Sequence, residues 1–276
     1  MKSFEVVVDG RKVAYWQHGA VDGVPLVLLH GLGGDHRGLQ ELAAHLANYN
    51  VLIPDLPGYG RSETMPGRQT LANYAAFVEK FRSRLELGDI YLAGHSFGAT
   101  TALIYAATYP NHLRKLCLMS PVTESQSVMA GLGKLYYTIA GKLPKPLARF
   151  WLTNRLAVFI TDELILRTPD RARRKQILDW DYAAYKTASI DALVQGFLSF
   201  SEEKLHTYPS AVVAPTLVLG GDKDPLADPA TLRTIEAAMP HASTVIVAGG
   251  GHLLPVEEPL SVAGQLDTFF TGTIQR

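Results

Sequence analysis

The feature that most constrains the fold of this chain is the pentapeptide Gly94-His95-Ser96-Phe97-Gly98, which has the form Gly-x-Ser-x-Gly. An apolar run at residues 90–93 precedes it, and a helix-like run at residues 99–107 follows it. This context predicts a sharp strand-to-helix turn that exposes the serine hydroxyl, with the two glycines leaving room for closely packed backbone. Because such a pattern can also arise by chance, the rest of the chain must show whether a sheet and a site surround it.

Short apolar runs alternate with amphipathic segments along most of the chain. The first two expected strands, Phe4–Val8 and Val13–Gln17, are joined by the hairpin signal Asp9-Gly10. Helices are expected at residues 71–85, 99–107, 230–238 and 259–270. The alternation predicts an α/β fold with a mostly parallel central sheet and helices on both faces. The expected parallel strands are Pro25–Leu29, Val51–Ile53, Ile90–Ala93, Leu116–Met119, Thr216–Leu219 and Thr244–Val247.

One long segment lacks any strand pattern and is helical throughout. We therefore predict a core domain formed by residues 1–120 and 211–276, with a helical cap inserted at residues 121–210. A cap in this position is expected to lie over the carboxyl edge of the sheet, where open α/β sheets bind their ligands.

A base and an acid follow two later strands. His252 ends the run Gly249-Gly250-Gly251-His252, and Asp224 lies in residues 220–225. A serine hydroxyl needs a base to take its proton, and an imidazole base needs a carboxylate to orient it. Since all three side chains would leave the same edge of the sheet, Ser96, Asp224 and His252 are the predicted catalytic residues. Asp222 is an alternative acid, although a role in capping the local turn is favoured.

Residues 30–34, His-Gly-Leu-Gly-Gly, follow the expected strand Pro25–Leu29. Small residues let backbone amides approach a substrate oxygen, so this loop is a candidate oxyanion hole. Its predicted donors are the amides of Leu32 and Phe97. His30, Gly31, Gly33 and His95 are interpreted as structural or pocket residues.

These motifs, in this order, resemble the α/β-hydrolase fold superfamily over essentially the whole chain, and in particular its capped serine esterases. The resemblance supports the assignment of Leu32 and Phe97, and it favours Asp224 because the last residue of the Gly-x-x-Asp pattern carries the acid. Some relatives place the acid after an earlier strand, which makes Glu124 a further alternative. The matching segments are residues 30–34, 55–62, 94–98, 221–224 and 251–252.

Composition excludes several other classes of function. Basic and acidic residues balance at 26 each, which gives no sign of a nucleic-acid partner. We predict no metal and no cofactor, because no histidine pair has ligand spacing and the glycine run at residues 249–251 precedes a histidine rather than a helix. Cys117, the single cysteine, is expected to be buried in a strand. With no apolar span or signal region recognised, a cytoplasmic location is expected.

The expected cap is basic and also rich in apolar residues. Residues 121–175 contain ten Lys or Arg and four Asp or Glu, a net charge of 10 − 4 = +6. One interpretation is a lid that docks on an anionic membrane surface. The favoured interpretation is that the basic side chains are solvated and the apolar ones line an acyl pocket. The latter are Leu132, Leu135, Tyr136, Tyr137, Ile139, Leu143, Leu147, Phe150, Trp151 and Leu152.

The sequence therefore predicts a cofactor-independent serine hydrolase that cleaves small carboxylic esters with an apolar acyl or alcohol group. Alternatives on the same scaffold are a carbon–carbon bond hydrolase of vinylogous diketones, a lactonase and a perhydrolase. A non-catalytic ligand receptor would be favoured by loss of a catalytic residue, and none is missing. Substrate identity and oligomeric state do not follow from the sequence.

Overall fold

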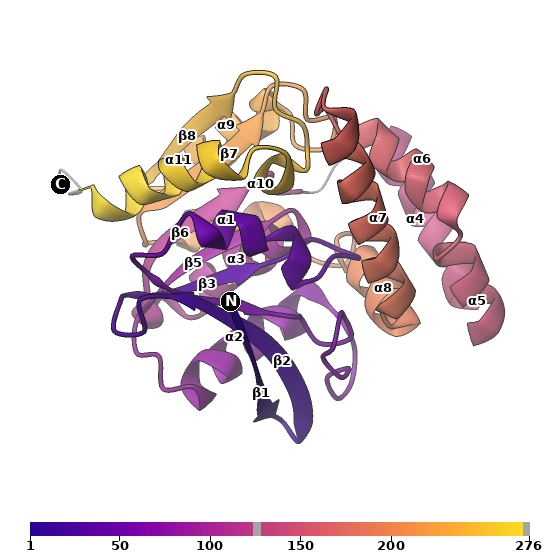
Figure 1. Ribbon diagram of the computed structural model, residues 1–276, viewed down its shortest axis with the longest axis horizontal. Helices are drawn as coiled ribbons and strands as arrows, with labels where there is room; N and C mark the ends of the chain where they lie inside the picture. The colour runs from indigo at the N-terminus through magenta and orange to yellow at the C-terminus, as the bar shows by residue number, and fades with distance from the viewer. Residues whose placement is uncertain (124–127, 273–276) are drawn as a thin grey trace.

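The computed structural model describes residues 1–123 and 128–272, and within them a single sheet has the strand order β1-β2-β4-β3-β5-β6-β7-β8 (Figure 1). The hairpin β1–β2 is antiparallel, and β2 pairs antiparallel with β4. All later pairs are parallel. The strands are β1 Lys2–Val8, β2 Arg11–Gly19, β3 Pro25–Leu29, β4 Asn50–Pro54, β5 Ile90–His95, β6 Leu113–Met119, β7 Thr216–Gly221 and β8 Ala242–Val247.

Helices cover both faces of the sheet. One face carries α1 (Gln40–Ala44) and α11 (Pro259–Thr271), and the other carries α2 (Leu71–Arg84), α3 (Phe97–Thr108) and α9 (Pro229–Ala237). The residues of β3 alternate accordingly, with Leu28 in the cluster under α1 and α11 and Leu29 in the cluster under α2 and α3. Because both faces are covered, the central strands are apolar throughout. The predicted α/β fold class is confirmed.

A helical insertion, α4–α8, separates β6 from β7 and lies at one end of the molecule (Figure 1). Asn154 and Asp170 cap α6 and α7 by accepting hydrogen bonds from amides in the first turn of each helix. None of the described helices is long and apolar enough to cross a membrane. The insertion consists of α4 Val128–Lys142, α5 Lys145–Leu152, α6 Arg155–Ile165, α7 Arg171–Thr187 and α8 Ile190–Ser199. The division into two domains at residues 121 and 210 stays a prediction.

The parallel strands bring four loops together at their carboxyl ends. Residues 30–34 follow β3, Ser96 follows β5, Asp224 follows β7, and His252 lies between β8 and the short helix α10 (Leu254–Glu257). Residues far apart in the chain thus share one edge of the sheet, beside the helical insertion.

Candidate active site

Ser96 lies on a strained turn between β5 and α3. Its φ is 52° and its ψ is −113°, and its amide donates to the carbonyl of Met119 at 2.9 Å. A Cβ at Gly94 would lie 2.2 Å from the carbonyl oxygen of Gly98. A Cβ at Gly98 would lie 2.4 Å from the carbonyl oxygen of Leu29. Both glycines are therefore required by the close packing of the turn, as the sequence predicted.

Ser96, His252 and Asp224 form a continuous chain of hydrogen bonds. The Ser96 hydroxyl donates to His252 Nε2 at 2.8 Å, and His252 Nδ1 donates to Asp224 Oδ1 and Oδ2 at 3.0 and 2.9 Å. The His252 and Asp224 side chains are buried, whereas Ser96 is partly exposed. The structure thus assembles a hydroxyl, an imidazole and a carboxylate in the order that proton transfer to His252 requires.

The Asp224 carboxylate is held in its charged form. Burial disfavours that charge, but hydrogen bonds from His252 and from the amides of Ala227 and Leu226 outweigh it and lower the pKa of Asp224 to about 2. Asp222, the alternative acid, instead accepts from the amide of Gly249 at 2.7 Å and contacts the turn, as expected. Glu124, the other alternative, lies outside the described residues.

His95 is buried behind the turn and contacts the candidate base. Its Nε2 donates to the backbone carbonyl of His252 at 2.8 Å, and the two rings are 5.4 Å apart. Burial, followed by the nearby His252, lowers the pKa of His95 to about 3, so the ring is neutral over the working pH range. His95 therefore fixes the backbone of the loop that carries His252.

The loop after β3 is held by His30. Its Nδ1 donates to the Gly31 carbonyl at 2.8 Å, and its Nε2 accepts from the Leu56 amide at 2.9 Å. A Cβ on Gly31 would lie 3.2 Å from His95 Nδ1, so this loop passes directly beside the turn that carries Ser96. These contacts are consistent with a structural role for His30, which stays a prediction.

Two backbone amides near Ser96 remain available to a ligand. Phe97 opens α3, where the first amides of a helix lack an intrahelical acceptor. Among the described residues, neither the Phe97 amide nor the Leu32 amide donates to a protein acceptor. These are the two donors that the sequence predicted for an oxyanion hole.

The helical insertion contacts two of the loops that form this site. The ring of Tyr185, in α7, lies so close to Gly33 that a Cβ there would be 2.3 Å from it. A Cβ on Gly196, in α8, would lie 3.3 Å from a Leu32 methyl group. The amide of His252 donates to the carbonyl of Ile165, the last residue of α6, at 3.1 Å. The insertion thus covers the loop after β3 and anchors the loop that carries His252.

Aromatic side chains pack where α3 meets the insertion. Phe97 meets Phe200 edge-on with centroids 5.8 Å apart, and Tyr137 stacks on Phe197 at 4.2 Å. These apolar surroundings, together with the partly exposed Ser96, favour an apolar substituent on the substrate.

Two acids in the insertion, one buried and one half-buried, escaped sequence analysis. Asp162 in α6 is 3 % exposed, and its Oδ2 has no hydrogen-bond partner among the described residues. Burial, and then the neighbouring charge of Asp181 in α7, raises the pKa of Asp162. Burial likewise raises the pKa of Asp181, followed by the charge of Asp35. The sequence did contain a signal for the burial of Asp162. This residue lies on the inward stripe of α6 with Val158 and Ile165, at i, i+4 and i+7 spacing.

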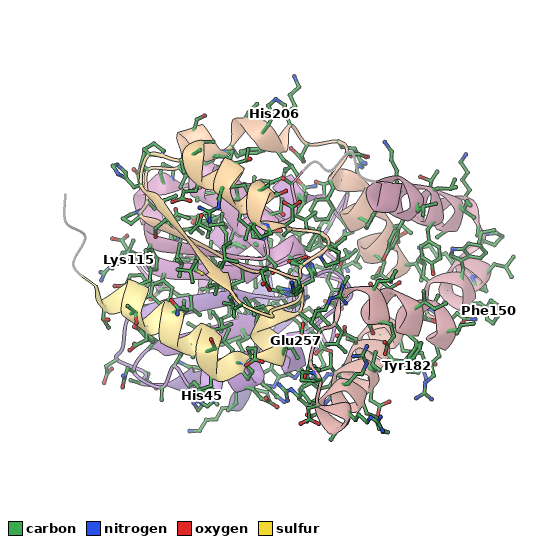
Figure 2. All side chains as sticks on the ribbon, turned by 90° about the horizontal axis from the view of Figure 1, so that it is seen from above. His45, Lys115, Phe150, Tyr182, His206 and Glu257 are labelled. Atoms are coloured by element: carbon green, nitrogen blue, oxygen red, sulfur yellow. The ribbon has the colours of Figure 1, made fainter. Side chains whose placement is uncertain are left out.

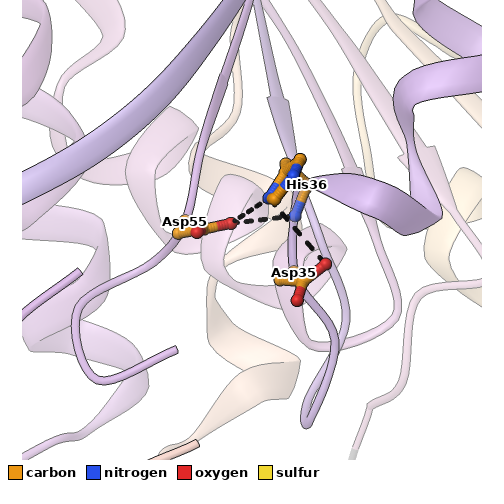
Figure 3. Close-up of side chains that lie close together, drawn as sticks. All are labelled: Asp35, His36 and Asp55. Carbon is orange, nitrogen blue, oxygen red and sulfur yellow. Dashed lines mark hydrogen bonds and ion pairs between the residues drawn. The ribbon is translucent and has the colours of Figure 1, made fainter. Parts of the chain in front are cut away.

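A second cluster, Asp35, His36 and Asp55, also went unrecognised (Figure 3). Asp55 Oδ1 accepts from both the amide and Nδ1 of His36 at 2.9 Å, and Asp55 Oδ2 accepts from the Arg61 amide at 2.8 Å. Asp35 forms an ion pair with the Arg37 guanidinium at 2.5 Å. Since the Arg37 guanidinium neutralises Asp35 and the oxygens of Asp55 already accept from His36 and Arg61, the cluster is suited to bracing the loops after β3 and β4 rather than to holding a cation.

Comparison with known proteins places this architecture in a family. A model of the alpha/beta hydrolase fold matches residues 24–259, so the chain belongs to the α/β-hydrolase fold family. Lipase 1 of Psychrobacter immobilis is 26 % identical, over 91 % of this chain and 78 % of the lipase. Lipase 3 of Moraxella sp. (strain TA144) is 25 % identical, over 96 % of this chain and 83 % of the lipase. The enol-lactonase of Burkholderia xenovorans LB400 shares the fold with a TM-score of 0.83 at 19 % identity, covering 97 % of this chain and all of the lactonase. The chain is thus a hydrolase of this fold, as the motifs suggested.

Proposed function

We propose that this chain is a serine hydrolase that cleaves carboxylic esters through an acyl-enzyme intermediate. The observation that carries the proposal is the hydrogen-bonded chain from Ser96 through His252 to Asp224, with Ser96 Oγ 2.8 Å from His252 Nε2. A serine aligned with a base in this way is poised for nucleophilic attack. The similarity to two lipases, which are ester hydrolases by name, supports the choice of esters.

The proposed reaction uses these contacts in turn. His252 takes the proton of Ser96 as Oγ attacks the ester carbonyl, and the charged Asp224 stabilises the resulting imidazolium. The amides of Leu32 and Phe97 hold the negatively charged oxygen of the tetrahedral intermediate. His252 then gives its proton to the leaving alcohol, and water releases the acid from Ser96 by the same steps in reverse.

The preferred substrate is a small ester with an apolar acyl or alcohol group. The aromatic contacts between α3 and the insertion, from Phe97 to Phe200 and from Tyr137 to Phe197, support this preference. Burying an apolar chain contributes about 0.8 kcal/mol per methylene, so hydrolysis should become more efficient as the chain lengthens until the space is filled.

A panel of p-nitrophenyl esters from acetate to decanoate tests the proposal, with Ser96→Ala and His252→Ala as variants. Both variants should lose at least about a thousandfold in kcat, and a fluorophosphonate probe should label His252→Ala far more slowly than the natural chain. Ester hydrolysis that survives in Ser96→Ala would refute Ser96 as the nucleophile. Asp222→Asn is the matched control for Asp224→Asn, because only Asp224 contacts His252.

The same catalytic residues could serve carbon–carbon bond cleavage, lactone hydrolysis or perhydrolysis. Similarity to an enol-lactonase at 19 % identity shows the fold alone, so it does not favour the lactonase. Turnover of vinylogous diketones or lactones at least tenfold above the best ester would replace the ester assignment with that reaction. A non-catalytic receptor would bind the fluorophosphonate probe without covalent labelling of Ser96.

A further inference from the structure

The helical insertion exposes an unusual number of large apolar side chains. They recur at i, i+3 and i+4 spacings along three helices, so each helix presents one apolar stripe to solvent. We call this surface the outer apolar face. Its members are Leu132, Leu135 and Ile139 in α4, Leu147, Phe150 and Trp151 in α5, and Leu156, Phe159, Ile160 and Leu164 in α6.

Six members of this face were expected to line an acyl pocket, and the structure corrects that interpretation because all six are exposed (Leu132, Leu135, Ile139, Leu147, Phe150 and Trp151). Phe150 is 71 % exposed and points away from the rest of the molecule, at the end opposite α11 (Figure 2). The inward stripes of the same helices are formed by other residues, including Tyr137, Leu152 and Val158, which are buried. The outer apolar face is therefore not needed to complete the core.

The three helices of the outer face carry an excess of positive charge. Residues 128–165 contain five Lys or Arg and two Asp or Glu, a net charge of 5 − 2 = +3. One of these acids, Asp162, faces inward, and burial raises its pKa. Lys134 and Lys142 make no ion pair with any described residue and lie on the exposed side of α4.

A shallow groove of about 280 Å3 between α6 and α7 adjoins this face. Its floor includes Phe159, a member of the outer apolar face, and Tyr182. Four of its lining residues are basic and two are acidic. Glu163 pairs with Arg174, and Asp179 pairs with both Arg155 and Lys175. Arg171 therefore leaves a net positive charge beside an apolar floor.

We propose that the outer apolar face docks on the surface of an anionic lipid bilayer. An amphipathic surface with aromatic and aliphatic side chains flanked by Lys and Arg is suited to lie at the boundary between headgroups and acyl chains. Anionic headgroups complement the positive charge of this face. A second copy of the chain would not complement it, because joining two such faces would bring two sets of positive charges together.

Docking in this orientation would place the catalytic loop close to the lipid. The helix α6, which contributes four members of the face, ends at Ile165, whose carbonyl binds the amide of His252. The candidate active site would then receive apolar substrates directly from the bilayer surface.

Vesicle co-sedimentation of the full chain tests the proposal without reference to catalysis. The vesicles are phosphatidylcholine alone, or phosphatidylcholine with 30 mol % phosphatidylglycerol. We expect binding to the anionic vesicles that is at least tenfold tighter than to the neutral ones and that weakens at 0.5 M NaCl. Absent binding, or equal binding to both vesicles, would overturn the proposal.

Matched variants locate the surface. The double variant Phe150→Ser/Phe159→Ser should weaken vesicle binding at least about tenfold. Val21→Ser/Leu260→Ser, at exposed apolar residues outside the insertion, should not. Lys134→Gln/Lys142→Gln should weaken binding about 25-fold, at about fivefold per charge, compared with Lys2→Gln/Lys12→Gln in β1 and β2. Circular dichroism and p-nitrophenyl ester turnover should be unchanged in all four double variants.

Sedimentation velocity tests the alternative that the face joins two copies of the chain. If Phe150→Ser/Phe159→Ser abolished a dimer and left vesicle binding intact, the face would be a contact between copies and the proposal would be wrong.

Discussion

At the scale of single residues, Gly98 shows how little room the candidate site has. A Cβ at this position would lie 2.4 Å from the Leu29 carbonyl oxygen and 2.6 Å from that of His30. Because both atoms belong to backbone, Gly98→Ala should lower the free energy of unfolding by more than about 3 kcal/mol and displace Ser96. Urea denaturation and fluorophosphonate labelling measure the two effects. Gly264→Ala is the matched control, since a Cβ there meets nothing within 4 Å in helix α11 and should be neutral or stabilising.

His95 allows a separate test of how the His252 loop is positioned. His95→Phe keeps a ring behind the turn but removes the donor to the His252 carbonyl, which then lies buried and unpaired. We expect kcat to fall about tenfold with little change in KM, and stability to fall by about 1–3 kcal/mol. If kcat were unchanged while stability fell, His95 would be a packing residue with no part in positioning His252.

Sequence analysis identified the site residues that have a recognisable local sequence around them. Ser96, Asp224 and His252 each follow an apolar strand and stand among glycines, and the topology of a parallel sheet then brings them together. Asp162 has only the weaker signal of its place on the inward stripe of α6, and Asp181 has no such local signal. The approach of the two carboxyl groups depends on how α6 and α7 pack against each other, which the spacing of residues alone does not specify.

At the scale of elements, the pair α6 and α7 should make stability depend on pH. Burial raises the pKa of Asp162 above its unfolded value, so the folded chain binds the proton more tightly than the unfolded chain. The contribution of Asp162 to the free energy of unfolding is therefore fully favourable only below the pKa of the unfolded chain, near 3.8. This contribution is lost as pH rises toward the pKa in the folded chain. Asp162→Asn should raise the free energy of unfolding by about 1–3 kcal/mol at pH 8, with little change at pH 4.

Urea denaturation between pH 4 and pH 9 measures this dependence. Asp179→Asn, on the exposed side of α7, is the matched control and should leave stability nearly unchanged at any pH, since its ion pairs are at the surface. A loss of stability in Asp162→Asn at pH 8 would mean that the carboxylate is charged and paired in the folded chain.

The sequence predicted the central strands more accurately than the ends of β1 and β2 or the orientation of the helices in the insertion, for a physical reason. Central strands such as β3 and β5 are covered on both faces and therefore read as continuous apolar runs. The edge strand β1 and its neighbour β2 extend beyond the expected segments, to Lys2 and to Gly19, because the added residues pair through backbone and need no apolar side chain. The insertion was recognised as helical, but the alternation of its residues could not show which of two apolar stripes faces inward.

At the scale of the whole molecule, the candidate site lies between the central sheet and the helical insertion. These two parts differ in how extensively their elements are packed. The strands β3, β5 and β6 are paired on both sides and covered by helices, whereas α4 packs against α5 and α8, and α6 packs against α7. Each helix of the outer apolar face also has one side in solvent. We therefore expect hydrogen exchange, measured by mass spectrometry, to be slowest in β3, β5 and β6 and faster by orders of magnitude in α4, α5 and α6.

Reaction of Ser96 with a fluorophosphonate should change this pattern selectively. The adduct would contact Leu32 and Phe97, and Gly196 of α8 lies against both side chains, so exchange in α8 should slow. The helix α5, which packs against α4 and α8, should respond less. Anionic vesicles should produce the opposite pattern, protecting α4, α5 and α6 and leaving α8 unchanged. If both treatments protected the same helices, the site and the outer apolar face would act as one surface rather than two.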